Sequence, residues 1–166
     1  NLKRVAVDPG KDDLSSFPFL YLTGLDEFTF SDAAVAELKK FFRNGGKLLI
    51  NNGLGLKTFD QAVQRELKRV LPNRELGQIP LEHDIYSTLQ PVTQVRYTPA
   101  LLKAKPELAG KPVLHGISTD GELQVIYSPY DLEAGWLNVN YPLSRGYQPN
   151  SARALGMNVI AYIIAN

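Results

Sequence analysis

The sequence predicts an α/β fold in which helices cover both faces of a mainly parallel sheet. Phe19–Leu22 is a continuous apolar run, typical of a strand that is buried on both faces. The segment 31–43 has apolar residues at helical spacing behind Ser31, a good N-cap. Lys47–Ile50 then returns to strand character. A strand, a helix and a strand in so short a stretch indicate a right-handed βαβ unit with parallel strands.

The elements around this unit follow from the same signals. Leu2–Val7 alternates enough to predict a short first strand. Gly45 and Gly46 end the first helix, and one of them is expected in the left-handed conformation that follows many helices. A second helix is expected to start with a capping box formed by Thr58 and Gln61.

The second half of the chain is less regular. A short strand is predicted near 75–79, and residues 80–121 are expected to be loops and short strands within the same domain. Leu123–Tyr127 has strand character, and 132–149 is again irregular. The last helix is expected to start at Asn150 or Ser151, and its apolar composition predicts that it docks deeply on the sheet.

Composition excludes several classes of function. The chain has 166 residues, enough for a single domain. Its net charge of +1 argues against nucleic-acid binding, and no apolar run is long enough to span a bilayer. With 0 cysteines and 2 histidines, disulfides, thiolate metal sites and a cysteine nucleophile are excluded. Because histidines are few as well, no metal site is predicted. Gly53-Leu54-Gly55 lacks the other residues of dinucleotide and phosphate-binding loops, and no cofactor is predicted.

Polar residues follow three of the predicted strands, at 23–26, 51–53 and 128–131. In an open parallel sheet, ligands bind beyond the carboxyl ends of the strands, so these segments are expected to form one site. Asn51 and Asn52 would exchange hydrogen bonds with a ligand, while Tyr130 or Trp136 would supply an apolar wall. The candidate binding residues are Gly24, Asp26, Asn51, Asn52, Gly53, Tyr130, Asp131 and Trp136.

Each candidate also has a structural interpretation. Asn51 and Asn52 would equally serve to cap their own turn, and the aromatic residues to pack an irregular loop. The loop with Glu82, His83 and Asp84 either folds over the strand ends or is solvated. His115, before Gly116, is interpreted as a structural residue in a turn.

Several stretches together resemble a bacterial family, domain of unknown function 4159. They are Phe17–Gly24 (FPFLYLTG), Gly45–Asn52 (GGKLLINN), Arg65–Pro72, Ile79–Tyr86, Asp131-Leu132, Gly135-Trp136 and Gly156–Tyr162. The resemblance covers nearly the whole chain from Phe17 onward, and the order and spacing of the stretches carry it.

The resemblance implies a three-layer, flavodoxin-like fold similar to class I glutamine amidotransferases, with no established activity. It also implies an extra strand and helix upstream of Asn1. Some members are joined to membrane-anchored segments, which implies an extracytoplasmic or membrane-associated setting. The family's acidic pair is replaced here by Asn51 and Asn52, and its frequent His after Thr-Gly by Leu25. Neither amide can be a nucleophile, which argues against amidotransferase chemistry.

Two hypotheses of function result. The preferred one is a non-catalytic module that binds a small polar ligand or a protein partner at the strand ends. The alternative is a hydrolase or transferase in which His83 is the general base, oriented by Asp26, Glu82 or Asp131. A structural module or homodimer would be favoured by an apolar sheet edge left open.

Overall fold

Five strands form one mixed sheet in the order β1-β2-β5-β4-β3. The computed structural model describes residues 5–139 and 141–166. The strands are β1 (Phe19–Gly24), β2 (Lys47–Asn52), β3 (Gly77–Gln78), β4 (His115–Thr119) and β5 (Glu122–Ser128). β1, β2 and β5 are parallel, whereas β4 runs antiparallel to β5 and β3 to β4.

The α/β class is therefore confirmed, but the parallel part of the sheet is limited to three strands. A tight turn joins β4 to β5, and its residues Asp120 and Gly121 have φ of 53° and 89°. Two successive positive φ angles are typical of the turn that links antiparallel neighbours. This hairpin reverses the direction of β4. It also explains why His115 is the first residue of a strand, where the sequence predicted a turn.

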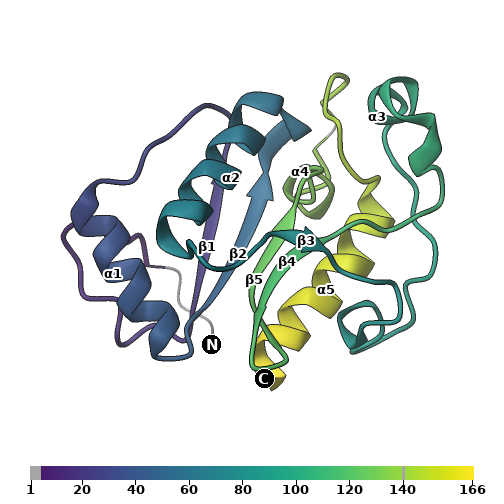
Figure 1. The fold of residues 1–166 in the computed structure, drawn as a ribbon. Coiled ribbons are helices and arrows are strands. Elements are labelled where there is room, and N and C mark those ends of the chain that lie inside the picture. Colours follow the sequence, from purple (N-terminus) through teal and green to yellow (C-terminus); the bar gives the residue numbers. More distant parts are fainter. Residues whose placement is uncertain (1–4, 140) are drawn as a thin grey trace.

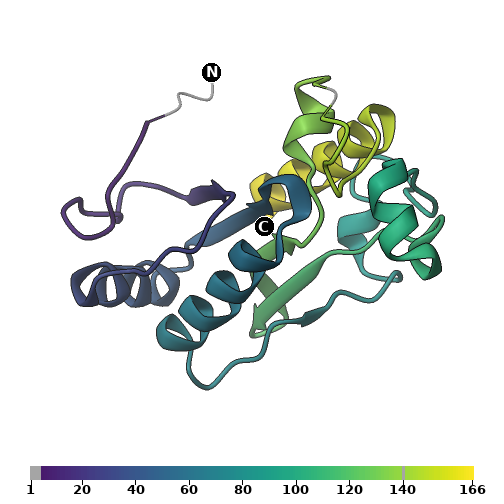
Figure 2. The same cartoon turned by 90° about the horizontal axis from the view of Figure 1, so that it is seen from above.

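Helices cover both faces of the sheet (Figures 1 and 2). α1 (Asp32–Arg43) and α2 (Lys57–Val70) lie on one face, and α4 (Glu133–Trp136) and α5 (Pro149–Ala165) on the other. The middle of the chain contains α3 (Pro99–Ala104) and the short 3₁₀ turns Asp84–Tyr86 and Pro106–Leu108. A third 3₁₀ turn, Gly53–Gly55, directly follows β2.

The caps explain where the first two helices begin and end. Ser31 Oγ accepts a hydrogen bond from Ala34 N at 3.1 Å, as predicted, and Gly45 has φ of 82° beyond the end of α1. The predicted capping box of α2 is wrong, because the helix already begins at Lys57. The Asn52 side chain instead bonds both the backbone N and O of Leu56, each at 2.9 Å.

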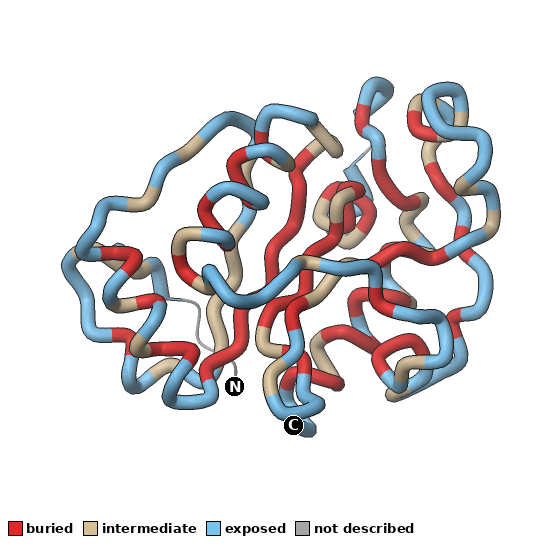
Figure 3. The backbone as a smooth tube through the Cα atoms, in the orientation of Figure 1, coloured by how far each residue is buried: buried red, intermediate tan, exposed pale blue. Residues whose placement is uncertain are grey.

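Two apolar clusters hold the layers together. One joins α1 and α2 to the sheet through residues such as Phe41 and Phe59, and the other joins α5 through residues such as Leu155 and Val159. All six residues of β2 are buried between them, as Figure 3 shows. Burial of one large aliphatic side chain contributes about 1.5–3 kcal/mol to stability. β2 is therefore held firmly in the core, and the residues at its carboxyl end have a fixed position.

The predicted first strand lies partly outside the described residues, which begin at residue 5. Residues 5–7 are not in a strand, and within the described residues β1 pairs only with β2. Among residues 5–139 and 141–166, β1 is therefore the outermost strand on its side of the sheet. The predicted strand near 75–79 is reduced to β3, and the last helix begins at Pro149.

Candidate functional site

The carboxylate of Asp131 joins the segments that follow β2 and β5. Its Oδ1 accepts hydrogen bonds from Glu133 N at 2.9 Å and from Ala134 N at 3.2 Å. Its Oδ2 accepts from Leu54 N at 3.0 Å and from Ser144 Oγ at 3.3 Å. The carboxylate thus holds the turn after β2, the start of α4 and the segment before α5. We call this arrangement the Asp131 clamp.

Asn51 completes the clamp from the tip of β2. Its Nδ2 donates to Asp131 Oδ1 at 3.2 Å and to Thr23 Oγ1 at 3.3 Å, and its Oδ1 accepts from Leu132 N at 2.8 Å. The side chain is buried, and both ends of the amide are occupied. Thr23 in turn donates to Glu133 Oε2 at 3.1 Å.

Asn52 points to the opposite face and is also occupied. In addition to its two bonds with Leu56, its Nδ2 donates to Tyr127 Oη at 3.4 Å. Tyr127 donates its own hydroxyl proton to Asp60 Oδ1 at 2.7 Å. Burial, followed by this bond to Asp60, raises the pKa of Tyr127 well above its usual range. The buried hydroxyl is a proton donor to Asp60 and remains neutral.

His115 lies beside this network and was not expected there. Its ring is 6.2 Å from the Tyr127 ring, measured between centroids. Burial lowers the pKa of His115, while the nearby Asp60 partly offsets that effect. The antiparallel direction of β4 brings His115 to this edge of the sheet, which is why the sequence alone did not place it here.

The tip of β2 requires close backbone packing. A Cβ on Gly24 would lie 2.5 Å from Phe59 Cε2, and one on Gly53 would lie 2.7 Å from Leu25 Cδ2. Leu54 has φ of 56°, a left-handed conformation that costs a non-glycine residue about 1–2 kcal/mol. Its N–H donates to Asp131 and its carbonyl accepts from Arg145 N at 3.0 Å, which together stabilise that conformation.

Three other predicted site residues contact different parts of the fold or solvent. The Tyr130 hydroxyl accepts from Lys105 Nζ at 3.2 Å, on the side toward α3. Trp136 donates its indole N–H to Ala152 O at 2.6 Å and packs on Gly156, between α4 and α5. Asp26 is exposed beyond the end of β1. The polar atoms of both aromatic side chains therefore take part in hydrogen bonds within the fold.

His83 lies at the opposite end of the sheet. It lines an open groove of ≈630 Å³ together with Glu122, the first residue of β5, and Tyr162, near the end of α5. The prediction that its loop folds over the carboxyl ends of the strands is wrong. Asn51 pairs with Ser128, the last residue of β5, so the length of that strand separates it from Glu122.

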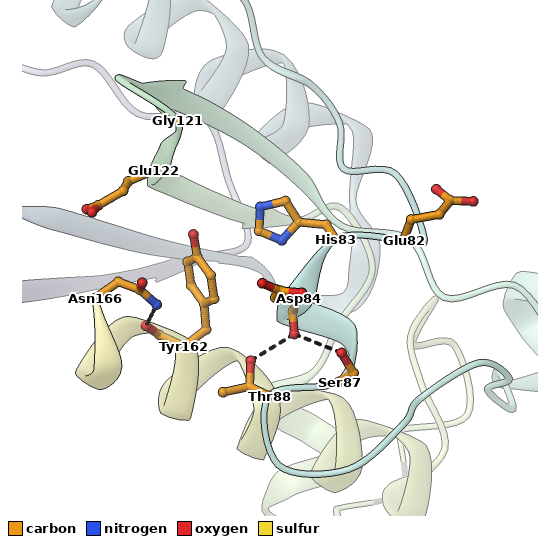
Figure 4. A pocket seen from close by; sticks show the side chains of 9 residues that line it. All are labelled: Glu82, His83, Asp84, Ser87, Thr88, Gly121, Glu122, Tyr162 and Asn166. Carbon is orange, nitrogen blue, oxygen red and sulfur yellow. Dashed lines mark hydrogen bonds between the residues drawn. The ribbon is translucent and has the colours of Figure 1, made fainter.

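The acids that were predicted to orient His83 do not face its imidazole, since Asp26 and Asp131 lie at the carboxyl end of the parallel strands. Its Nδ1 accepts from Ile85 N at 3.1 Å, and its ring lies 5.4 Å from that of Tyr162. Figure 4 shows the Glu82 carboxylate directed away from the imidazole. Within residues 5–139 and 141–166, no three His, Asp or Glu side chains converge to hold a metal ion.

A feature that sequence reasoning missed is an exposed apolar loop between α4 and α5. We define it by Leu137, Val139, Tyr141 and Leu143, all of which are exposed, Leu143 by 84%. Figure 1 shows this segment beyond the end of the sheet where the parallel strands finish. The signal was present in the sequence, because the four apolar residues alternate with other residues. No prediction was drawn from this alternation, because the segment is irregular.

The comparisons with known proteins agree with the resemblance found in the sequence. A family model described as "Domain of unknown function (DUF4159)" matches residues 1–164. The chain belongs to this family. A comparison with curated proteins finds no match. Among the described residues of this DUF4159 domain, no helix has both the length and the apolar character required to cross a membrane.

Proposed function

We propose that this domain is a non-catalytic module that binds a protein partner through the exposed apolar loop at the carboxyl edge of the sheet. The observation that carries the proposal is a contrast between two neighbouring groups of residues. The polar side chains at the strand tips are buried and bonded to one another, whereas the loop that they hold exposes four large apolar side chains.

The hydrogen bonds of the clamp favour a protein over a small polar ligand. Asn51 bonds with both ends of its amide, and Asp131 accepts five hydrogen bonds. A ligand that bound these groups would have to break bonds that stabilise the fold. We infer that the strand tips position the loop and do not contact a ligand themselves.

The composition of the loop supports a protein partner with an apolar cleft. Isolated exposed apolar residues are ordinary, but four within seven positions make a patch of the kind that marks interaction sites. Arg145 and Arg153 are exposed at the base of the loop, and neither forms an ion pair with another described residue. A cleft with an acidic rim would complement both features.

The architecture is part of the same proposal. We propose a flavodoxin-like, class I glutamine amidotransferase-like ancestry for the parallel β1-β2-β5 core with helices on both faces. The turn after β2, where such enzymes hold their nucleophile, here contains Asn51, Asn52 and Gly53. This supports a binding role without catalysis.

Site-specific photocrosslinking tests the proposal. The protein is made in cells with a photoreactive residue at position 143 and irradiated there. This should yield one cross-linked adduct of discrete mass, and adding Leu137→Ser to the same chain should reduce the yield of that adduct at least several-fold. The matched control is the same photoreactive residue at position 68, where exposed Lys68 lies on α2. Equal yields at positions 143 and 68, or a yield insensitive to Leu137→Ser, would overturn the proposal.

A further inference from the structure

The chain contains two Asn-Gly pairs, and the structure places them in opposite surroundings. Asn44-Gly45 directly follows α1, and Asn52-Gly53 lies at the end of β2. Asparagine before glycine is the pair most prone to spontaneous deamidation, because glycine has no side chain to hinder the attack of its own backbone nitrogen on the preceding amide. The fate of each pair therefore depends on how firmly the fold holds it.

Asn52 is held by the fold at both ends of its amide. The residue is 1% exposed, and its side chain bonds the backbone N and O of Leu56 and the hydroxyl of Tyr127. Gly53 is buried, and a Cβ there would lie 2.9 Å from Gly24 O, so its backbone has no room to move. A reaction at this pair requires the end of the central strand to open, which costs nearly as much as global unfolding.

Asn44 and Gly45 are exposed at the end of α1. Figure 3 shows this turn exposed and the following strand, β2, buried. The N–H of Gly45 donates to Phe42 O at 3.1 Å, and the N–H of Gly46 donates to Phe41 O at 3.0 Å. These two bonds close the end of the helix. Helix ends fray, and opening of an exposed end costs little, so the nitrogen of Gly45 is released far more often than that of a buried turn.

We propose that Asn44 is a site of spontaneous covalent modification, which converts it to aspartate and isoaspartate. The backbone nitrogen of Gly45 attacks Cγ of Asn44 and forms a C–N bond. The bond from Cγ to the side-chain nitrogen breaks, and ammonia leaves with the proton of the attacking N–H. Water then opens the succinimide ring. Opening at Cγ gives aspartate, whereas opening at the backbone carbonyl carbon gives isoaspartate, in which the main chain runs through Cβ and Cγ.

The isoaspartyl form acts on β2, because the connection between α1 and β2 is short. Gly45 and Gly46 alone separate Asn44 from Lys47, the first residue of the strand. Gly46 is buried, and a Cβ there would overlap the Phe41 ring. One additional backbone carbon therefore pushes Gly46 against Phe41 or shifts the start of β2. The new carboxylate also lies at the carboxyl end of α1, where the helix dipole disfavours a negative charge.

Peptide mapping of the whole chain compares the two pairs directly. One sample is incubated in its native state at mildly alkaline pH, and a second is incubated unfolded in guanidinium chloride at the same pH. Cleavage after lysine then separates residues 41–47 from residues 48–57, and Asn44 is the only side-chain amide of the first peptide. Mass spectrometry detects the replacement of NH₂ by OH, and electron-transfer fragmentation distinguishes aspartate from isoaspartate.

The native sample should show conversion of peptide 41–47 that exceeds that of peptide 48–57 by at least about tenfold, with isoaspartate among the products. In the unfolded sample the two peptides should convert at similar rates, because both contain an Asn-Gly pair. Asn44→Gln is the matched control and should abolish conversion of peptide 41–47, since glutamine closes its larger ring far more slowly. Equal conversion of the two peptides in the native sample would overturn the proposal. So would a native peptide 41–47 that stays intact while its unfolded counterpart converts.

Urea unfolding of the modified chain tests the effect on β2. The isoaspartyl form, separated by ion exchange, should unfold at a lower urea concentration than a freshly prepared Asn44→Asp variant. That variant carries the same charge without the additional backbone carbon. Equal midpoints for the two proteins would overturn the inferred effect on the strand.

Discussion

Replacing Asp131 by Asn should loosen the carboxyl edge of the sheet. The substitution keeps the size of the side chain but replaces one oxygen by an NH₂ group. Oδ1 accepts from two backbone N–H groups and from Asn51, so the amide oxygen should occupy that position. The NH₂ group then faces the N–H of Leu54, which donates to Oδ2 in the wild type at 3.0 Å.

The expected cost follows from this contact. A buried donor that loses its acceptor costs about 1–3 kcal/mol, and the left-handed Leu54 loses a contact that stabilises it. Ser144 can rotate its hydroxyl and accept from the new amide, so it adds little. We expect Asp131→Asn to lower the free energy of unfolding by about 2–3 kcal/mol. Asp131→Ala removes all five hydrogen bonds and should cost about 4 kcal/mol or more.

Urea unfolding followed by fluorescence measures both effects, because Trp136 lies on α4 and is the only tryptophan. Asp26→Asn is the matched control, since Asp26 is exposed, and it should change stability by less than about 0.5 kcal/mol. An Asp131→Asn variant as stable as the control would refute the clamp, because it would mean that the carboxylate satisfies no buried donor.

Three further predictions concern the two faces of the sheet. Asn51→Ala should lower the unfolding free energy by about 2–3 kcal/mol in urea titration, because the buried Leu132 N–H loses its acceptor and Asp131 and Thr23 lose a donor. Glu66→Gln should lower stability at pH 7 by about 2 kcal/mol, measured by thermal unfolding. Burial opposes the charge of Glu66, but Arg65, the Phe30 N–H and Arg69 outweigh that effect and lower its pKa. No loss of stability at pH 7 would exclude a stabilising role for the Glu66 carboxylate. Because the pKa of His115 is lowered in the folded state, the unfolded chain binds a proton more readily. The free energy of unfolding should therefore fall as the pH falls below about 6.5. His115→Gln should reduce the difference in that free energy between pH 7 and pH 5, measured by denaturant unfolding.

Local sequence signals were sufficient to predict the central βαβ unit. The apolar run of β1, the Ser31 cap and the glycines after α1 each act within a few residues, so the sequence shows them directly. The capping of α2 was mispredicted, because Asn52 is four residues from the Leu56 that it caps. That hydrogen bond depends on the conformation of the turn between the two residues, which the sequence preferences of helix caps do not predict.

The candidate site was only partly predictable for a related reason. Strand ends can be found from sequence, but whether their side chains are free depends on partners far along the chain. Asp131 bonds Leu54, a residue 77 positions away, and only the fold brings the two together. The positions of His83 and His115 depend on the direction of β4 and of the middle segment, which no local pattern specifies.

Hydrogen exchange at the backbone amides of Leu54, Glu133 and Ala134 tests the central claim most directly. These N–H groups all donate to Asp131. The clamp predicts that they exchange slowly, with opening free energies close to that of global unfolding, and that Asp131→Asn accelerates Leu54 most. Rapid exchange at these amides in the wild type would contradict the account, because it would leave the carboxylate free to bind a ligand.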